Sequence, residues 1–125
     1  MRLSIGKLET FTFPSGIYIY TGSARGGGGL YPRLKRHLAG PDKLHWHIDY
    51  LSVKAVNKSF YVVRTEKPLE CELNRAVASL PGSRIVAPGF GSSDCRCRSH
   101  LHYLVKSARP DFPGLEPWPE SFNEV

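Results

Sequence analysis

A run of four glycines, residues 26–29, separates two segments with different patterns, and it constrains the fold more than any other feature. Before it, residues 17–21 read IYIYT, and β-branched and aromatic residues at this density are typical of a strand. After it, Leu30, Leu34 and Leu38 recur at the spacing of one helix face. Glycine reaches backbone conformations closed to other residues, so the chain can turn between the two elements. We predict a strand, a glycine-rich turn and a helix.

The predicted helix is basic on a face beside its leucines. Arg33 and His37 are four residues apart, which places them one turn from each other. Lys35 and Arg36 belong to the same helix, and Arg25 stands just before the glycine run. A guanidinium can hold two phosphate oxygens at once and stays charged. We predict that this segment binds phosphate; the alternative is a set of solvated surface cations.

Length, charge and cysteine count limit the classes of protein to consider. A chain of 125 residues, 41% of them hydrophobic, can form one domain with a single core. The net charge of +6 favours a polyanionic partner such as nucleic acid. No apolar run approaches membrane-spanning length and no apolar leader is evident, so we expect a cytoplasmic protein with no membrane partner. Three cysteines, an odd count, argue against a disulfide framework.

The other segments predict short strands, one clear helix and one ambiguous segment. Residues 45–51 fit either a short helix or a strand, and we prefer the helix. Strands are expected within 1–13, 53–56, 59–64, 84–87 and 101–105, and a helix is expected at 69–80. These elements predict an α/β or α+β domain over residues 1–106, with a small mixed or antiparallel central sheet flanked by helices. Residues 107–125 hold four of the ten prolines and are expected to form an extended tail.

Several motifs resemble a known nuclease superfamily. Tyr20-Thr21-Gly22-Ser23-Ala24, followed by Arg33-Leu34 and His37, resembles the second half of the GIY-YIG motif. The chain is most similar to a small branch described as a domain of unknown function, found alone or fused to base-excision glycosylases. That similarity spans about residues 5–105 and rests on five motifs: YTGSA (20–24), RHL (36–38), WHIDYL (46–51), GFGSSDCRC (89–97) and SHL (99–101).

The resemblance departs from the superfamily pattern at the first tyrosine. The superfamily carries Gly-Ile-Tyr on a separate upstream strand. Here Gly16-Ile17-Tyr18 lies too close to Tyr20 to form a strand of its own. We therefore expect the first strand of the superfamily to be missing or shortened.

The resemblance implies a divalent-metal-dependent phosphodiester hydrolase. It assigns Arg33 to the phosphate, and it assigns Mg²⁺ or another divalent cation to one glutamate of the later helix, Glu70, with Glu72 as the competitor. Tyr20 corresponds to the second motif tyrosine, and Tyr18 is the candidate to replace the first. Either carboxylate could instead be a surface group that interacts favourably with the dipole at a helix N-terminus. The tyrosines could instead pack against neighbouring strands.

These residues predict one shared site. Arg33, Glu70 and the two tyrosines are expected to ring an exposed, positively charged hollow at the end of the strand that holds Tyr20. His37 and His47 would lie at its rim, although His37 could equally interact with a helix C-terminus. The later helix has an apolar stripe, which leaves Glu70 and Asn74 on a different face; the stripe comprises Leu69, Leu73, Ala76, Val77 and Leu80.

Cys95, Cys97 and His100 form an alternative, softer metal site. Zinc favours four ligands and cysteines separated by two residues, whereas these two cysteines are separated by one. A fourth ligand would have to come from elsewhere in the fold, with three candidates: Cys71, His45 and His47. We expect reduced cysteines rather than an essential zinc site. The loop before them, which ends at Asp94, could also present backbone N–H groups to phosphate.

Three functions are compatible with these features. The preferred hypothesis is a metal-dependent endonuclease, and DNA is expected rather than RNA. The second is a nucleic-acid-binding domain that keeps the phosphate site without turnover. The third is a zinc-stabilised interaction module. The first two share the same nucleic-acid contacts: Arg25, Lys35, Arg36 and His47.

Overall fold

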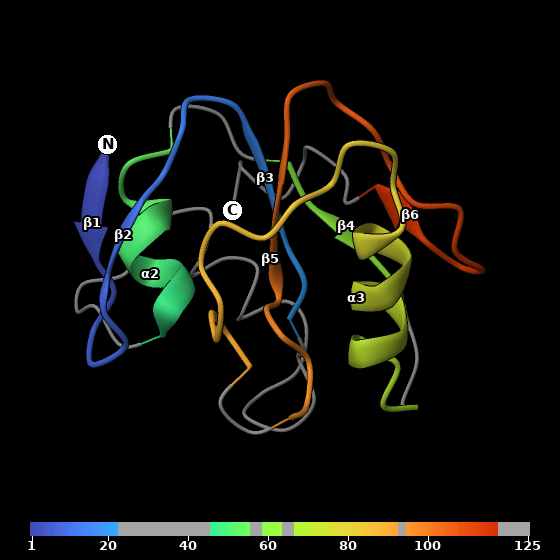
Figure 1. Cartoon of the computed structure of the whole chain (residues 1–125). Helices are drawn as coiled ribbons and strands as arrows, with labels where there is room; N and C mark the ends of the chain where they lie inside the picture. The colour runs from blue at the N-terminus through green and yellow to red at the C-terminus, as the bar shows by residue number, and fades with distance from the viewer. Residues whose placement is uncertain (23–45, 56–58, 64–66, 93–94, 118–125) are drawn as a thin grey trace, which may run out of the picture.

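The computed structural model describes residues 1–22, 46–55, 59–63, 67–92 and 95–117. Within them the chain forms two helices and three two-stranded antiparallel sheets, an α+β domain as expected (Figure 1). None of the described helices is long and apolar enough to cross a membrane. The elements in order are β1 (Arg2–Ser4), β2 (Thr10–Thr12), β3 (Ile17–Tyr20), α2 (His47–Ser52), β4 (Tyr61–Val62), α3 (Glu70–Ala78), β5 (Leu101–Leu104) and β6 (Glu116–Pro117).

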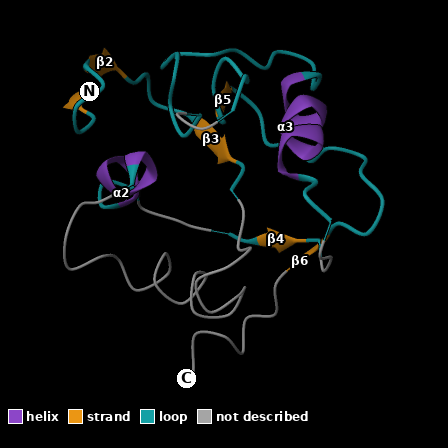
Figure 2. Cartoon of the chain, turned by 90° about the horizontal axis from the view of Figure 1, so that it is seen from below, coloured by secondary structure: helices purple, strands orange, loops and turns teal. Residues whose placement is uncertain are grey.

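The central pair is formed by β3 and β5, which are far apart in the sequence. Ile17 pairs with Leu104 and Tyr20 with Leu101, so the pair runs antiparallel. All four residues of β5 are buried. Both views place this pair between α2 on one side and α3 on the other (Figures 1 and 2). The strand expected at residues 17–21 and the strand expected at 101–105 are therefore confirmed.

The first strands form a hairpin that closes one end of the core. Leu3 pairs with Phe11, and Gly6, at a φ of 51°, lies in the connection between β1 and β2. Ile5 and Phe13 are buried against α2 and the segment after α3, where they join a cluster with four other residues. That cluster comprises Ile5, Phe13, Leu51, Ala87, Phe90 and Leu101.

Residues 47–52 form helix α2, which confirms the helical interpretation of the segment whose pattern fitted either a helix or a strand. The carboxylate of Asp49 accepts the backbone N–H of Trp46 at 2.8 Å, which satisfies a donor at the start of the helix. Leu51 faces the core. The strand predicted at 53–56 is wrong for residues 53–55, because the backbone N–H groups of Lys54 and Ala55 turn back to the carbonyls at the end of the helix.

Helix α3 is shorter than predicted, and one residue of its polar face lies inside. Asn74 is buried, and its side-chain amide donates to the carbonyl oxygen of Ser99 at 2.8 Å. The prediction that placed Asn74 away from the core was wrong, because a buried carbonyl needed a donor that an apolar side chain cannot supply. The contact ties α3 to the residue next to His100.

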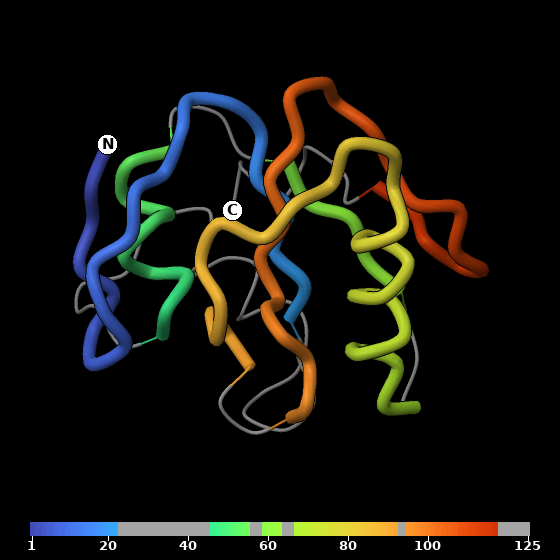
Figure 3. Tube along the Cα trace, in the orientation of Figure 1, coloured from blue at the N-terminus to red at the C-terminus, as the bar shows by residue number. Residues whose placement is uncertain are grey.

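The segment after α3 runs back across β5 toward α2 (Figure 3). Arg84 and Tyr103 exchange two backbone hydrogen bonds of 3.1 and 2.8 Å. These bonds attach the segment to β5. Beyond this bridge the strand predicted at 84–87 does not form. Ala87 and Phe90 then enter the core.

The proline-rich segment contributes a strand. β6 pairs with β4, with Val62 opposite Glu116. The strand expected at 59–64 is limited to β4 among the described residues. Residues 116–117 therefore add to the sheet structure, whereas residues 118–125 lie outside the described part of the chain.

Candidate metal centre

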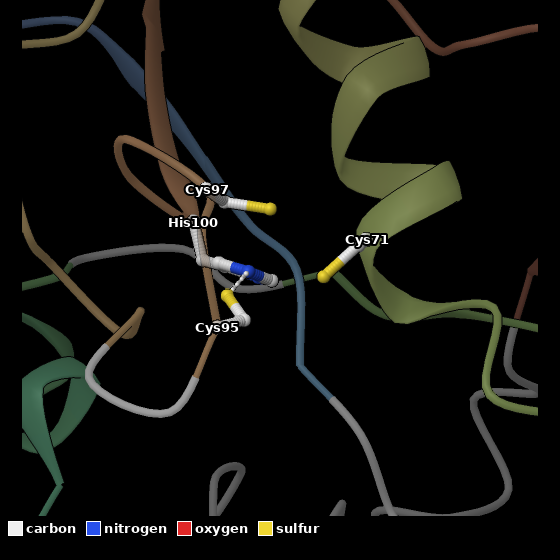
Figure 4. A group of neighbouring side chains, drawn as sticks. All are labelled: Cys71, Cys95, Cys97 and His100. Carbon is white, nitrogen blue, oxygen red and sulfur yellow. Dashed lines mark hydrogen bonds between the residues drawn. The ribbon is translucent and has the colours of Figure 1, made fainter.

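Four side chains from three parts of the chain meet near the end of β3. Cys71 comes from the first turn of α3, Cys95 and Cys97 come from the loop before β5, and His100 immediately precedes that strand. Their ligand atoms, three Sγ and one ring nitrogen, all lie within 4.8 Å of one another. The side chains point toward a common centre (Figure 4). We call these four residues the Cys/His cluster.

His100 is the buried member of the Cys/His cluster, and its orientation is set by Thr21, the residue that follows β3. Its side chain is 0% exposed. Its Nδ1 lies 2.9 Å from the carbonyl oxygen of Thr21, and its Nε2 lies 3.1 Å from Sγ of Cys95. A carbonyl can only accept, so Nδ1 is the donor and Nε2 keeps its lone pair for the thiols or a cation. A backbone carbonyl that orients the ring in this way is typical of histidines that bind metals.

Backbone contacts fix the loop that carries His100. The N–H of His100 donates to the carbonyl oxygen of Phe90 at 2.7 Å, and the N–H of Thr21 donates to the carbonyl oxygen of His100 at 3.0 Å. Gly91, at a φ of 68°, lies so near Tyr20 that an added Cβ would come within 2.8 Å of the tyrosine ring. Only glycine fits there, which explains one glycine of the GFGSS motif.

Glu70 lies beside the Cys/His cluster. Its Oε2 is 3.7 Å from Nδ1 of His100, and its side chain is 27% exposed. Glu70 is the residue before Cys71 on α3, whereas Glu72, the competing glutamate, is exposed to solvent. The carboxylate that was a candidate for a hard cation therefore neighbours the soft ligands.

The surroundings of Cys71 in the Cys/His cluster favour its neutral thiol when no cation is near. Hydrogen bonding to Cys97, burial, and a further hydrogen bond to Cys95 raise the pKa of Cys71 to about 12. Three thiolates within one small volume would repel one another. A divalent cation reverses this balance, because a coordinated thiol gives up its proton.

The donor set fits zinc better than magnesium. In a tetrahedral site with Zn–S bonds of about 2.3 Å, the sulfur atoms lie about 3.7 Å apart. No two ligand atoms of the Cys/His cluster are more than 4.8 Å apart. Magnesium prefers oxygen ligands, and three sulfurs and an imidazole offer none. The four residues could therefore hold a metal ion, and the expectation of reduced cysteines without an essential zinc stays a prediction.

Comparison with known proteins identifies the family. The family described as "Domain of unknown function DUF123" matches residues 1–112. The chain belongs to this family. No curated protein and no solved structure matches the chain.

The match to DUF123 spans both tyrosines of β3, and their surroundings differ. Tyr18 packs against Phe13 and Tyr103, with ring centroids 5.9 and 5.2 Å away, and its hydroxyl donates to the carbonyl oxygen of Pro14. Burial is the main reason that the pKa of Tyr18 rises to about 12. The ring of Tyr20 contacts Phe90 at 6.1 Å, near the Cys/His cluster end of β3. Tyr18 thus has the surroundings of a packing residue.

His47 anchors the loop of this DUF123 domain that leads to the cysteines. Its Nδ1 accepts the N–H of Gly91 at 2.7 Å, and its ring lies 5.6 Å from that of Phe90. Burial lowers the pKa of His47, so the acceptor form is favoured. His47 is half-buried and links α2 to this loop, and its predicted contact with nucleic acid stays a prediction.

The basic segment of the predicted site lies outside the described residues. This applies to Arg25, Arg33, Lys35, Arg36 and His37, and also to His45 and Asp94. The shared site of Arg33 and Glu70 therefore stays a prediction. What the structure brings together at the end of β3 is Glu70, His100 and the three cysteines.

Proposed function

We propose that this chain is a nucleic-acid-binding domain whose fold is closed by a structural zinc ion. The observation that carries the proposal is the Cys/His cluster, with four ligand atoms within 4.8 Å. Cys71, Cys95, Cys97 and His100 would hold the ion, which would link α3 to the loop and β5. Four protein ligands leave no open position, so the ion would stabilise the fold rather than bind substrate.

The net charge supports a polyanionic partner. Zinc with three thiolates and one neutral imidazole carries a net charge of −1, so the centre would not attract phosphate by itself. Phosphate contacts must come from cations elsewhere. Arg96 and Arg98 flank Cys97 and are exposed, and the basic segment 25–37 follows Thr21, whose carbonyl orients His100.

Salt and chelation together test this proposal. Binding of the zinc-loaded protein to a fluorescent DNA oligonucleotide should weaken steeply as salt rises, because each neutralised phosphate releases a counterion. A chelator should abolish the binding, because the fold would open. An RNA oligonucleotide of the same sequence is the comparison for DNA preference. Salt-independent binding would contradict a phosphate interface, and full binding after verified zinc removal would contradict the structural role of the ion.

Phosphodiester hydrolysis is a second candidate function, and the position of Glu70 favours it. This carboxylate lies 3.7 Å from Nδ1 of His100 and is partly exposed, at the end of β3 where the predicted arginine helix follows in the sequence. It could hold a hard cation separate from the soft cluster. The resemblance to GIY-YIG nucleases supports the same role.

Glu70 and Glu72 provide a matched pair of variants for testing hydrolysis. In the presence of Mg²⁺, Glu70→Gln should abolish cleavage of a DNA substrate while leaving DNA binding nearly unchanged. Glu72→Gln should retain cleavage, because Glu72 is exposed and is not the residue near His100. Gel analysis of the products gives the readout, with zinc content measured in every sample. If the wild-type protein binds DNA and never cleaves it, hydrolysis is excluded and binding remains as the only one of the two functions.

A further inference from the structure

The three sulfur atoms of the Cys/His cluster lie close enough together for a second chemistry besides metal binding. Cys71, Cys95 and Cys97 are free thiols, and no two of their Sγ atoms are more than 4.8 Å apart. A disulfide bond holds two sulfurs at about 2.05 Å, so a pair has less than about 3 Å to close, within the reach of side-chain rotation. All three cysteines are half-buried, so a small oxidant can reach them. The Cys/His cluster is therefore also a candidate site of disulfide formation.

Two of the three cysteines form the better matched pair. Sγ of Cys95 lies 3.1 Å from Nε2 of the buried His100, a contact that engages this sulfur. Hydrogen bonding to Cys97 is the first cause of the raised pKa of Cys71, ahead of hydrogen bonding to Cys95. The side chains of Cys71 and Cys97 extend toward each other from α3 and from the loop (Figure 4). These contacts favour a bond between Cys71 and Cys97 and leave Cys95 with His100.

A bond between Cys71 and Cys97 would join the same elements that zinc would join. Cys71 lies in the first turn of α3, and Cys97 lies in the loop before β5. Cys95 and Cys97 belong to one loop, so a bond between those two would leave α3 unattached. One turn further along α3, the Asn74 amide donates to the carbonyl oxygen of Ser99, which keeps the helix and the loop aligned.

We propose that Cys71 and Cys97 form a reversible disulfide bond that replaces the zinc ion when the protein meets a peroxide. The release of zinc rests on the proposed function, whereas the disulfide itself rests on the positions of the sulfurs. In the zinc-bound form both sulfurs are thiolates, and thiolates are the form that attacks a peroxide. Two thiolates, one hydrogen peroxide and two protons from solvent give one disulfide and two water molecules.

The oxidation consists of two displacement steps. The first thiolate attacks one oxygen of hydrogen peroxide, the O–O bond breaks, and hydroxide leaves while the sulfur becomes a sulfenic acid. The second thiolate attacks that sulfur, the S–O bond breaks, and a second hydroxide leaves. Two protons from solvent convert both hydroxides to water, and the peroxide has taken up the two electrons that the sulfurs lose. Zn²⁺ then keeps two of its four ligands, Cys95 and His100, and dissociates.

The disulfide-linked protein should stay folded after zinc has left. Its covalent link between α3 and the loop restricts the unfolded chain and opposes separation of the two segments. We therefore expect the oxidised, zinc-free protein to melt at a higher temperature than the reduced, zinc-free protein. A thiol reductant should remove that difference, and reductant supplied together with zinc should restore the melting temperature of the starting protein. An oxidised protein that melts no higher than the reduced, zinc-free one would show that the bond does not replace the ion.

Prolonged treatment of the zinc-loaded, full-length protein with hydrogen peroxide tests the proposal directly. We expect the bound zinc to be released, which a zinc-sensitive dye reports, and the chain mass to fall by two hydrogen atoms relative to the reduced chain. After the remaining thiol is alkylated, peptide mapping should find Cys71 linked to Cys97 and the label on Cys95. A bond mapped between Cys95 and Cys97 would overturn the assignment.

Cys95→Ser and Cys97→Ser are a matched pair of variants, because each removes one ligand of the Cys/His cluster and only one removes a partner of the bond. Under peroxide, Cys95→Ser should form the bond from Cys71 to Cys97 and melt at a higher temperature than its own reduced form. Cys97→Ser should form no disulfide and show no such rise. Equal disulfide formation in both variants would refute the preference for Cys97. The mapping of the wild-type protein decides the question even if neither variant folds when reduced.

The structural zinc and the disulfide can fail separately in these experiments. Purified protein that contains no zinc, stays folded and forms the bond between Cys71 and Cys97 would contradict the structural zinc and support the disulfide. Protein that holds zinc and under peroxide keeps both cysteines reduced, or oxidises them only to sulfinic acids, would contradict the disulfide and leave the zinc site intact.

Discussion

Cys71→Ser is expected to remove zinc from the protein and to unfold it. Structural zinc sites contribute about 10–16 kcal/mol of apparent binding energy in small zinc-finger peptides. A domain of this size is typically stable by only about 5–15 kcal/mol. Cys71 is the ligand that α3 supplies to the Cys/His cluster, so its loss would release that helix from the loop and β5. Metal analysis and thermal unfolding followed by circular dichroism provide the measurements.

Wild-type protein should contain one zinc per chain, and a strong chelator should reproduce the effect of Cys71→Ser. Before chelation a thiol reagent should modify none of the three cysteines rapidly, and after chelation it should modify all three. Glu72→Gln, the neighbouring change on the same helix turn, should cost at most about 1 kcal/mol, because only a favourable interaction with the helix dipole is lost. Metal-free wild-type protein that melts cooperatively, with Cys71→Ser equally stable, would restore the interpretation of reduced, structural cysteines.

The fold class was predictable because the strongest signals are local. The IYIYT segment contains β3, and residues 101–105, the last predicted strand, contain β5. Each segment has the composition of a buried strand. Asp49 starts α2 by capping the backbone three residues earlier, a preference encoded within one turn. One failure is also local in origin. Residues 53–55 have strand-like composition, yet they complete the C-terminal turn of α2.

The metal cluster was only partly predictable because one of its ligands is distant in sequence. Cys95, Cys97 and His100 lie within six residues, so their proximity was evident. Cys71 was one of three candidates for the fourth ligand, and no spacing rule joins it to the other three. Its position depends on the packing of α3, where the buried Asn74 bonds to the carbonyl of Ser99. Such a contact is tertiary, and no pattern along one helix reveals it.

His47 shows why the role of a histidine cannot be inferred from sequence alone. Its place in WHIDYL suggested a rim position at a phosphate site. In the structure its Nδ1 accepts the N–H of Gly91, and its ring makes an edge-to-face contact with the ring of Phe90. The loop conformation that makes this contact requires the glycine at a φ of 68°. Two segments that are remote in sequence thus determine the contacts of one side chain.

Phe90→Ala is expected to cost about 3–5 kcal/mol of unfolding free energy, because a large cavity would remain in the core. Phe90 is 0% exposed, and its ring contacts those of both Tyr20 and His47. It therefore joins β3, α2 and the loop that leads to the cysteines. The bond from the N–H of His100 ends on the backbone carbonyl of Phe90, so alanine would keep it. Chemical denaturation of the zinc-loaded protein gives the free energy.

Two comparisons make the Phe90 prediction specific to the core and separate it from metal loss. Val105→Ala, at a residue that is 76% exposed, should change the free energy of unfolding by less than about 0.5 kcal/mol. Folded Phe90→Ala should still contain zinc, because none of the four ligands is altered and the carbonyl that holds His100 remains. If Phe90→Ala costs no more than Val105→Ala, the core is not centred on this residue. If it loses zinc while still folded, the loop depends on the ring of Phe90 rather than on its backbone.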